Sequence, residues 1–172
     1  QLKALDKKLN TLFKELKVYN EDQLNRSPKE EAWSVIQVLH HLLLSENASL
    51  KYVKKKLSFN PELKKAGIKS GFRVMVLNTY LGSPLKRKAP DAISGDNLPS
   101  HETFWKTAQL WKSHRKELRE FLENVDEELL DKEVYKHPFV GRISIAGMLQ
   151  FFNHHFDRHN KQIKRTIKNY TK

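Results

Sequence analysis

The chain lacks cysteine entirely, which excludes a disulfide framework and any metal site built from thiolates. Glycine and proline are scarce, with six of each among 172 residues. Leucine, lysine and glutamate are abundant instead, and this composition favours helices over sheets and irregular structure. Because the absence of cysteine fits a reducing compartment, we expect a cytoplasmic protein.

Long apolar runs are absent too. No stretch approaches the roughly 18 consecutive apolar residues that a membrane-spanning helix needs, and the opening residues Gln1, Leu2 and Lys3 do not resemble a secretion signal. A length of 172 residues is enough for one domain to bury most of its apolar surface. We therefore expect a single domain over residues 1–172 and no membrane partner.

The chain is strongly basic, with a formal net charge of +12 and a pI of about 9.8. Such a charge raises nucleic acid as a partner. The basic residues are scattered, however, in groups at 7–8, 54–56, 64–65, 86–88 and 161–172. No glycine-aromatic RNA signature accompanies them. Solvated helix faces are therefore the favoured interpretation, and a nucleic-acid-associated protein is the less favoured one.

Apolar residues recur at three- and four-residue spacing in four long segments, which predicts four helices. They cover residues 2 to about 19, 35 to about 57, 100 to about 122 and 144–167, with Ser100 and Ser144 as caps of the last two. Residues 58–99 form a long connection that carries a short helix over 72–81, and 123–143 form a second connection. We expect an all-α four-helix bundle with a long crossover connection between helices two and three.

Two histidines on the last predicted helix occupy positions where apolar side chains are expected. His155 falls three residues after Phe152, and His159 falls four residues before Ile163. Both imidazoles therefore face the core, about one helical turn apart. A buried imidazole needs a partner, and a metal ion is one candidate.

A third ligand is expected from the second helix. His41 follows Val38 by three residues and lies beside the inward stripe, whereas His40 is turned away by about 100°. Three neutral imidazoles would leave a coordination position open, and Zn²⁺ or Ni²⁺ suits all-nitrogen ligands best. The alternative is a set of core histidines that are hydrogen-bonded to polar neighbours such as Gln162 or Glu46.

Several motifs follow one another in a fixed order along the chain: Trp33-Ser34, His41-Leu42, His137-Pro138, Gly141 ahead of Ser144, and His155-x-x-Arg158-His159-x-x-Gln162-Ile163. Together they resemble the DinB-like (DinB/YfiT) superfamily. Its members are four-helix bundles with a crossover between the middle helices, and many bind a divalent metal through three histidines. The resemblance implies that His41, His155 and His159 are metal ligands, and that the protein forms a homodimer.

Some members of that superfamily are metal-dependent S-transferases that use bacillithiol, mycothiol or glutathione, and others are described as isomerases or hydrolases. The resemblance thus implies a metal-dependent enzyme, of the thiol S-transferase type or a related hydrolase or isomerase, acting on a small-molecule thiol and an electrophilic substrate. Lys161 stands where relatives often have glycine, which leaves the branch of the superfamily open. A metal-binding bundle without catalytic activity is the alternative.

The sequence suggests a role, with an alternative, for three further residues. Glu46 resembles an acidic position of the family and is the candidate catalytic residue, able to orient a ligand or accept a proton; the alternative is an exposed helix carboxylate. His114 borders an apolar stripe and is expected to be half-exposed, with a spare ligand role as the alternative. Arg158 flanks the site and serves either packing or a surface salt bridge.

Overall fold

The computed structural model describes residues 1–83, 85, 90–168 and 170, so the basic group at 86–88 and the end of the basic tail lie outside the described residues. The elements are α1 (Leu2–Leu16), α2 (Glu21–Asn25), α3 (Val35–Leu57), α4 (Ile68–Gly82), the short 3-10 helices η1 (Asp91–Ile93), η2 (Gly95–Asn97) and η3 (Glu127–Leu129), α5 (Phe104–Asn124), β1 (Tyr135–His137), β2 (Gly141–Ile143) and α6 (Ile145–Lys168). Apart from the two short strands, the regular structure of the described residues is helical. The predicted all-α class is confirmed.

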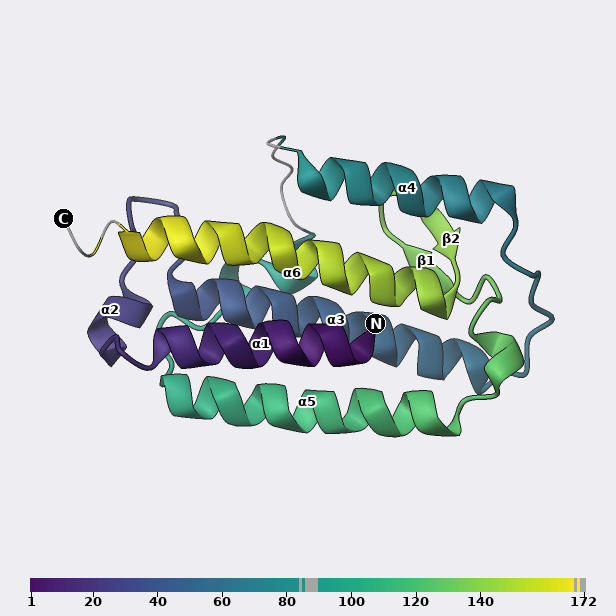
Figure 1. The fold of residues 1–172 in the computed structure, drawn as a ribbon, viewed down its shortest axis with the longest axis horizontal. Helices are drawn as coiled ribbons and strands as arrows, with labels where there is room; N and C mark the ends of the chain where they lie inside the picture. Colours follow the sequence, from purple (N-terminus) through teal and green to yellow (C-terminus); the bar gives the residue numbers. More distant parts are fainter. Residues whose placement is uncertain (84, 86–89, 169, 171–172) are drawn as a thin grey trace.

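Four long helices lie side by side along the molecule (Figure 1). α3 packs against α5 and α6, and α1 packs against the same two helices. α1 and α6 run in one direction, whereas α3 and α5 run in the other, so α3 and α5 are parallel (Figure 1). The connection between them carries α4, which packs along the outer side of α6 and on β2.

The core is built from the apolar stripes that the sequence pattern predicts. Its largest fully buried side chains are Trp111, Phe152, Phe156, Leu5, Leu12, Leu16, Leu24, Ile36, Leu39, Leu42, Leu50 and Leu77. α4 approaches α6 closely at Gly147, where an added Cβ would lie 2.9 Å from Cγ2 of Val74. A glycine is therefore required on α6 at this contact.

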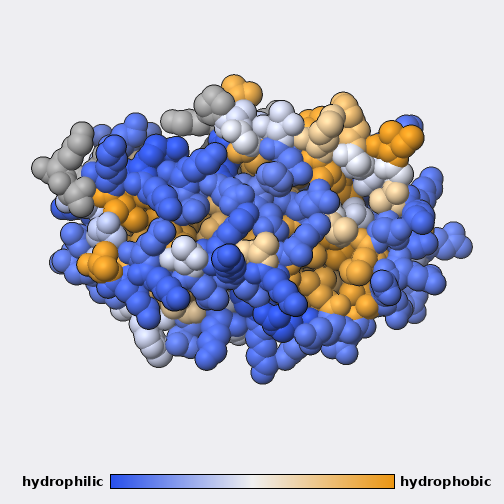
Figure 2. Space-filling model, in the orientation of Figure 1, coloured by the Kyte–Doolittle hydropathy of each residue, from blue (hydrophilic) through white to orange (hydrophobic). Residues whose placement is uncertain are grey.

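The face shown in Figure 2 is mostly hydrophilic, and hydrophobic side chains gather over α4, at the upper right of the picture. Large apolar residues exposed on this helix include Ile68, Phe72 and Met75. Among the described residues, no helix is long and apolar enough to cross a membrane.

Capping side chains explain where the helices begin. The Ser34 side chain accepts a hydrogen bond from the backbone N–H of Gln37 at 3.2 Å, and Oε1 of Gln37 accepts one from the backbone N–H of Ser34 at 3.0 Å. α3 therefore starts as predicted. Ser144 caps α6 by accepting from the Gly147 N–H at 3.0 Å.

The predicted cap at Ser100 is wrong. Thr103 caps α5 by accepting from the N–H of Lys106 at 3.2 Å. The helix starts later because the backbone of Glu102 is tied to α2, where the Asn25 side chain bonds both its N–H and its C=O at 3.0 Å.

The second connection contains a β-hairpin that the periodicity did not predict. β1 and β2 pair antiparallel, with Tyr135 opposite Ile143 and His137 opposite Gly141. Gly141 has φ +83°, a conformation that favours glycine at this turn. Tyr135 and His137 are buried while Lys136 between them is exposed, because side chains alternate along a strand. The hairpin therefore turns these two rings toward the bundle.

Candidate metal site

The structure brings together the three histidines that sequence reasoning selected. His41 of α3 and His155 and His159 of α6 form the three-histidine cluster, in which one ring nitrogen from each residue lies within 4.8 Å of the others. Their exposed fractions are 3%, 7% and 8%. His40, the neighbour of His41, faces α5 instead, where its Nε2 lies 3.1 Å from Oγ1 of Thr107.

Hydrogen bonds fix the tautomers of two of these rings. The Nδ1–H of His41 donates to the carbonyl oxygen of Ile93 at 2.7 Å, because a carbonyl can only accept. The Nδ1–H of His159 donates in the same way to Oε1 of Gln162 at 2.8 Å. Each ring is left with an unprotonated Nε2 that can act as a ligand. An imidazole whose other N–H is held by an oxygen is the usual arrangement around a bound metal.

All three rings are neutral at ordinary pH. Burial lowers the pKa of His159 to about 3. Burial also lowers the pKa of His155 well below its usual value, and electrostatic repulsion from His159 and His41 lowers it further. Burial also lowers the pKa of His41, against the hydrogen bond to Ile93. Since only neutral imidazole binds a metal, the three rings are in the protonation state that metal binding requires.

One pair of ring nitrogens in the cluster has the spacing expected around a divalent ion. Nε2 of His41 lies 3.2 Å from Nε2 of His155. Two imidazole nitrogens at tetrahedral positions around Zn²⁺ would be about 3.3 Å apart, given Zn–N bonds of about 2.0–2.1 Å. The donor set and the unprotonated Nε2 atoms of His41 and His159 thus suit a small divalent cation.

The three-histidine cluster lines a cavity of about 1420 Å³. Its other walls include the aromatic rings of Trp33, Tyr80, Tyr135 and Phe151, and charged side chains surround them. Trp33 also packs on the cluster directly, with its ring centroid 4.8 Å from that of His41. A cavity of this size can accept a small molecule next to the three imidazoles.

The family model described as the DinB superfamily matches residues 1–163. The chain belongs to the DinB superfamily. This DinB-superfamily chain is also similar to "Uncharacterized protein YuaE" of Bacillus subtilis (strain 168), with 28% identity over 155 residues, covering 88% of each chain. No solved structure matches the chain.

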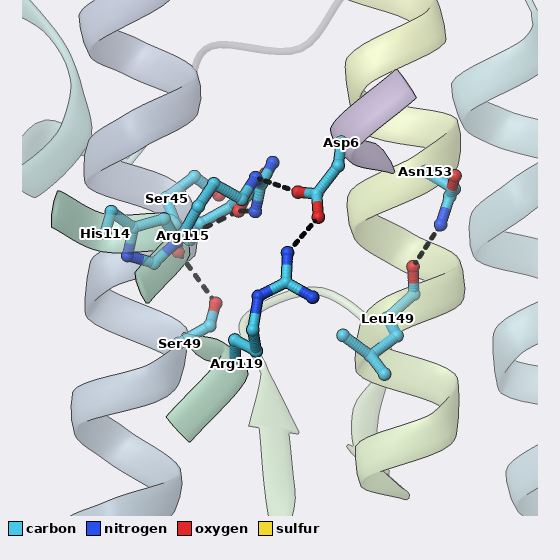
Figure 3. A network of polar contacts seen from close by, with 9 residues as sticks. Asp6, Ser45, Ser49, His114, Arg115, Arg119, Leu149 and Asn153 are labelled. Atoms are coloured by element: carbon cyan, nitrogen blue, oxygen red, sulfur yellow. Dashed lines mark hydrogen bonds and ion pairs between the residues drawn. The ribbon is translucent and has the colours of Figure 1, made fainter. Parts of the chain in front are cut away.

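Glu46 of this DinB-superfamily protein is not exposed, and it is not among the described residues that line the cavity. It is 1% exposed and faces α5, where Arg115 holds both carboxylate oxygens and Nε2 of His114 lies 3.0 Å from Oε2. Asp6 of α1 extends this network by contacting Arg115 and Arg119 (Figure 3). Burial raises the pKa of Glu46, but the Arg115 charge and the hydrogen bonds outweigh it and the pKa is lowered. These contacts give Glu46 a role in joining helices.

Two other expectations change with the structure. His114 is buried rather than half-exposed, because its ring is a partner of Glu46. The sequence predicts packing or a surface salt bridge for Arg158, but this side chain mainly forms hydrogen bonds to backbone carbonyls. Its guanidinium donates to the carbonyls of Leu81 and Ser83, at 3.3 and 2.7 Å, and so caps the C-terminal end of α4. Arg158 still lines the cavity next to the three-histidine cluster.

Sequence reasoning missed two residues that contact the cluster. Ile93 contributes a backbone carbonyl from η1, which no side-chain pattern can reveal. Phe151 lies one turn before His155, and its apolar side chain reads as ordinary core. The contact between His159 and Gln162 could be anticipated from the sequence, because residues three apart lie on the same face of a helix.

Proposed function

We propose that this protein is a metal-dependent enzyme whose three-histidine cluster holds one divalent ion. The observation that carries the proposal is the convergence of three buried, neutral imidazoles beside a cavity, two of them with Nδ1–H bonded to oxygen. Three protein ligands leave at least one coordination position for a bound molecule, which is typical of catalytic rather than structural metal sites. Zn²⁺ or Ni²⁺ suits the all-nitrogen donor set best.

The proposed reaction is S-transfer, in which the sulfur of a small-molecule thiol forms a bond to an electrophilic carbon as the bond from that carbon to its leaving group (a halide, or the oxygen of an epoxide) breaks and the thiol proton passes to solvent. A divalent ion held by the cluster would supply the Lewis acid that lowers the pKa of a bound thiol or water. The chain's own residues bind and orient. Ile93 and Gln162 hold the Nδ1–H sides of His41 and His159, which leaves the Nε2 atoms of both rings available, and aromatic side chains form part of the cavity wall beside them.

Glu46 does not act as a base in this proposal. Glu46 is paired with Arg115 and His114, so its two oxygens are already bonded on the α5 side. Proton release from the bound thiol to solvent is sufficient once its pKa is lowered.

Metal affinity tests the site. Protein purified without an affinity tag is stripped with a chelator and titrated with Zn²⁺ and Ni²⁺ in competition with a chromophoric chelator. We expect one ion per chain for wild type, and at least 100-fold weaker binding for His41→Ala, His155→Ala and His159→Ala. His40→Ala is the matched control, since it removes a neighbouring buried imidazole that faces Thr107, and its affinity should stay unchanged. Equal affinity in all four variants would contradict the site.

Activity is tested separately. Metal-loaded protein is incubated with bacillithiol, mycothiol or glutathione and a halogenated or epoxide electrophile, and loss of free thiol is followed. We expect turnover that disappears in His159→Ala and persists in His40→Ala. Stoichiometric metal binding with no turnover for any thiol would contradict S-transfer and leave the alternative, a metal-binding bundle without catalytic activity.

A further inference from the structure

The three rings of the cluster are not held in the same way. His41 and His159 each donate Nδ1–H to an oxygen. Nδ1 of His155 is buried and has no hydrogen-bond partner among the described residues. Metal-binding histidines usually have such a partner, because it fixes the tautomer and the ring plane. Within the described part of the chain, the His155 ring has a hydrogen-bond contact only at Nε2, which lies 3.2 Å from Nε2 of His41, so a different kind of contact must hold its Nδ1 side.

An aromatic stack occupies that role. Phe151 lies four residues before His155 on α6, so the two side chains share one face of the helix. Their ring centroids are 5.0 Å apart and their planes differ by only 17°, a stacked arrangement. A ring stacked in this way favours one plane of the imidazole, because rotation about its Cβ–Cγ bond would lose the face-to-face contact with the phenyl ring.

The β-hairpin supports the stack from outside. The His137 ring meets Phe151 edge-on, with centroids 4.7 Å apart and an interplanar angle of 73°. His137 is itself fixed, since its Nδ1 accepts a hydrogen bond from the N–H of Phe139 at 3.2 Å. The stack thus runs from the hairpin through Phe151 to His155.

We propose that Phe151 is a positioning residue for His155, whose stacked ring takes the place of the missing hydrogen bond and keeps Nε2 directed at the rest of the cluster. The inference depends on the proposed function, since it concerns how one proposed ligand is held. It assigns to the hairpin a part in the site: β1 supplies His137, which holds Phe151 in place. It also predicts that the site depends on the shape of this side chain and not only on its apolar character.

The test compares three variants by Zn²⁺ affinity, using competition with a chromophoric chelator, and by the visible absorption spectrum of the Co²⁺-loaded protein. Phe151→Leu keeps an apolar side chain but removes the ring, and we expect a 10- to 100-fold weaker Kd and an altered Co²⁺ spectrum. Phe151→Tyr retains the ring and should bind within about threefold of wild type. Phe152→Leu is the matched control: Phe152 is the next residue on α6 and fully buried, and its ring contacts Phe151 in a tilted arrangement at 5.7 Å, with no ring contact to His155 among the described residues.

Thermal melts of the metal-free variants confirm that each is folded at the titration temperature. Wild-type affinity in Phe151→Leu, or an equal loss in Phe152→Leu, would overturn the positioning role while leaving the metal site intact. Failure of Phe151→Tyr to recover affinity would also overturn it. Wild-type protein that bound no metal would instead overturn the proposed function, and this inference with it.

Discussion

Substitution of Arg115 tests the buried charge network that joins α1, α3 and α5. The Arg115 side chain is 8% exposed and bonds both oxygens of Glu46, which is 1% exposed. Arg115→Met would leave a fully buried carboxylate with His114 alone. Breaking a buried ion pair from one side costs about 3–5 kcal/mol of unfolding free energy. For a chain of this size that corresponds to a Tm lower by roughly 6–20 °C.

Arg119 provides the matched control. It lies one turn further along α5 and bonds Asp6 at 2.6 Å, but its side chain is 47% exposed. Arg119→Met should therefore cost about 0–1 kcal/mol, as exposed ion pairs do. Urea unfolding followed by far-UV circular dichroism gives both values on the same scale.

A double variant identifies the cause of the loss. Glu46→Gln removes the buried charge that Arg115→Met leaves without its cation. The double variant should therefore be more stable than Arg115→Met alone, a non-additivity that neighbours in one network show. A cost for Arg115→Met no larger than that for Arg119→Met, or a double variant less stable than the single one, would refute the reasoning.

Three further predictions concern packing, capping and pH. Gly147→Ala should lower the free energy of unfolding by about 1–3 kcal/mol because its Cβ would meet Val74 at 2.9 Å; an unchanged Tm would contradict the close contact. Ser34→Ala should cost about 1 kcal/mol through loss of the α3 cap, measured by chemical unfolding, whereas Ser34→Asp should retain most of the stability. Burial lowers the pKa of His159 to about 3 and of His137 to about 4, so the unfolded chain binds more protons than the folded one below pH 6.5. Metal-free protein should thus lose about 1 kcal/mol per pH unit for each of these histidines as the pH falls from 6 to 4, and a flat stability over that range would contradict their burial as neutral rings.

The sequence predicted the elements whose signal is local. The range Val35–Leu57 follows from an uninterrupted apolar pattern behind the Ser34 capping box. The convergence of the three histidines follows from stripes on α3 and α6 that must both face the core. The hairpin escaped prediction because strands of three residues are too short to show alternation.

Contacts between distant parts of the chain account for the other differences. Glu46 follows Leu42 by four residues and so continues the buried stripe of α3, but its partners His114 and Arg115 lie 68 and 69 residues away and have no local sign in the sequence. Ile93 reaches His41 through a backbone oxygen that every residue possesses. In each case the deciding partner depends on how helices pack, which periodicity within one helix does not specify.

The most direct measurement for the account as a whole is an anomalous-scattering map from crystals of the protein grown with Zn²⁺ or Ni²⁺ and collected at the absorption edge of the metal. We predict one strong peak inside the bundle, about 2.0–2.1 Å from a ring nitrogen of each of His41, His155 and His159. No peak at the three-histidine cluster at saturating metal, or a peak held by other residues, would contradict the central claim.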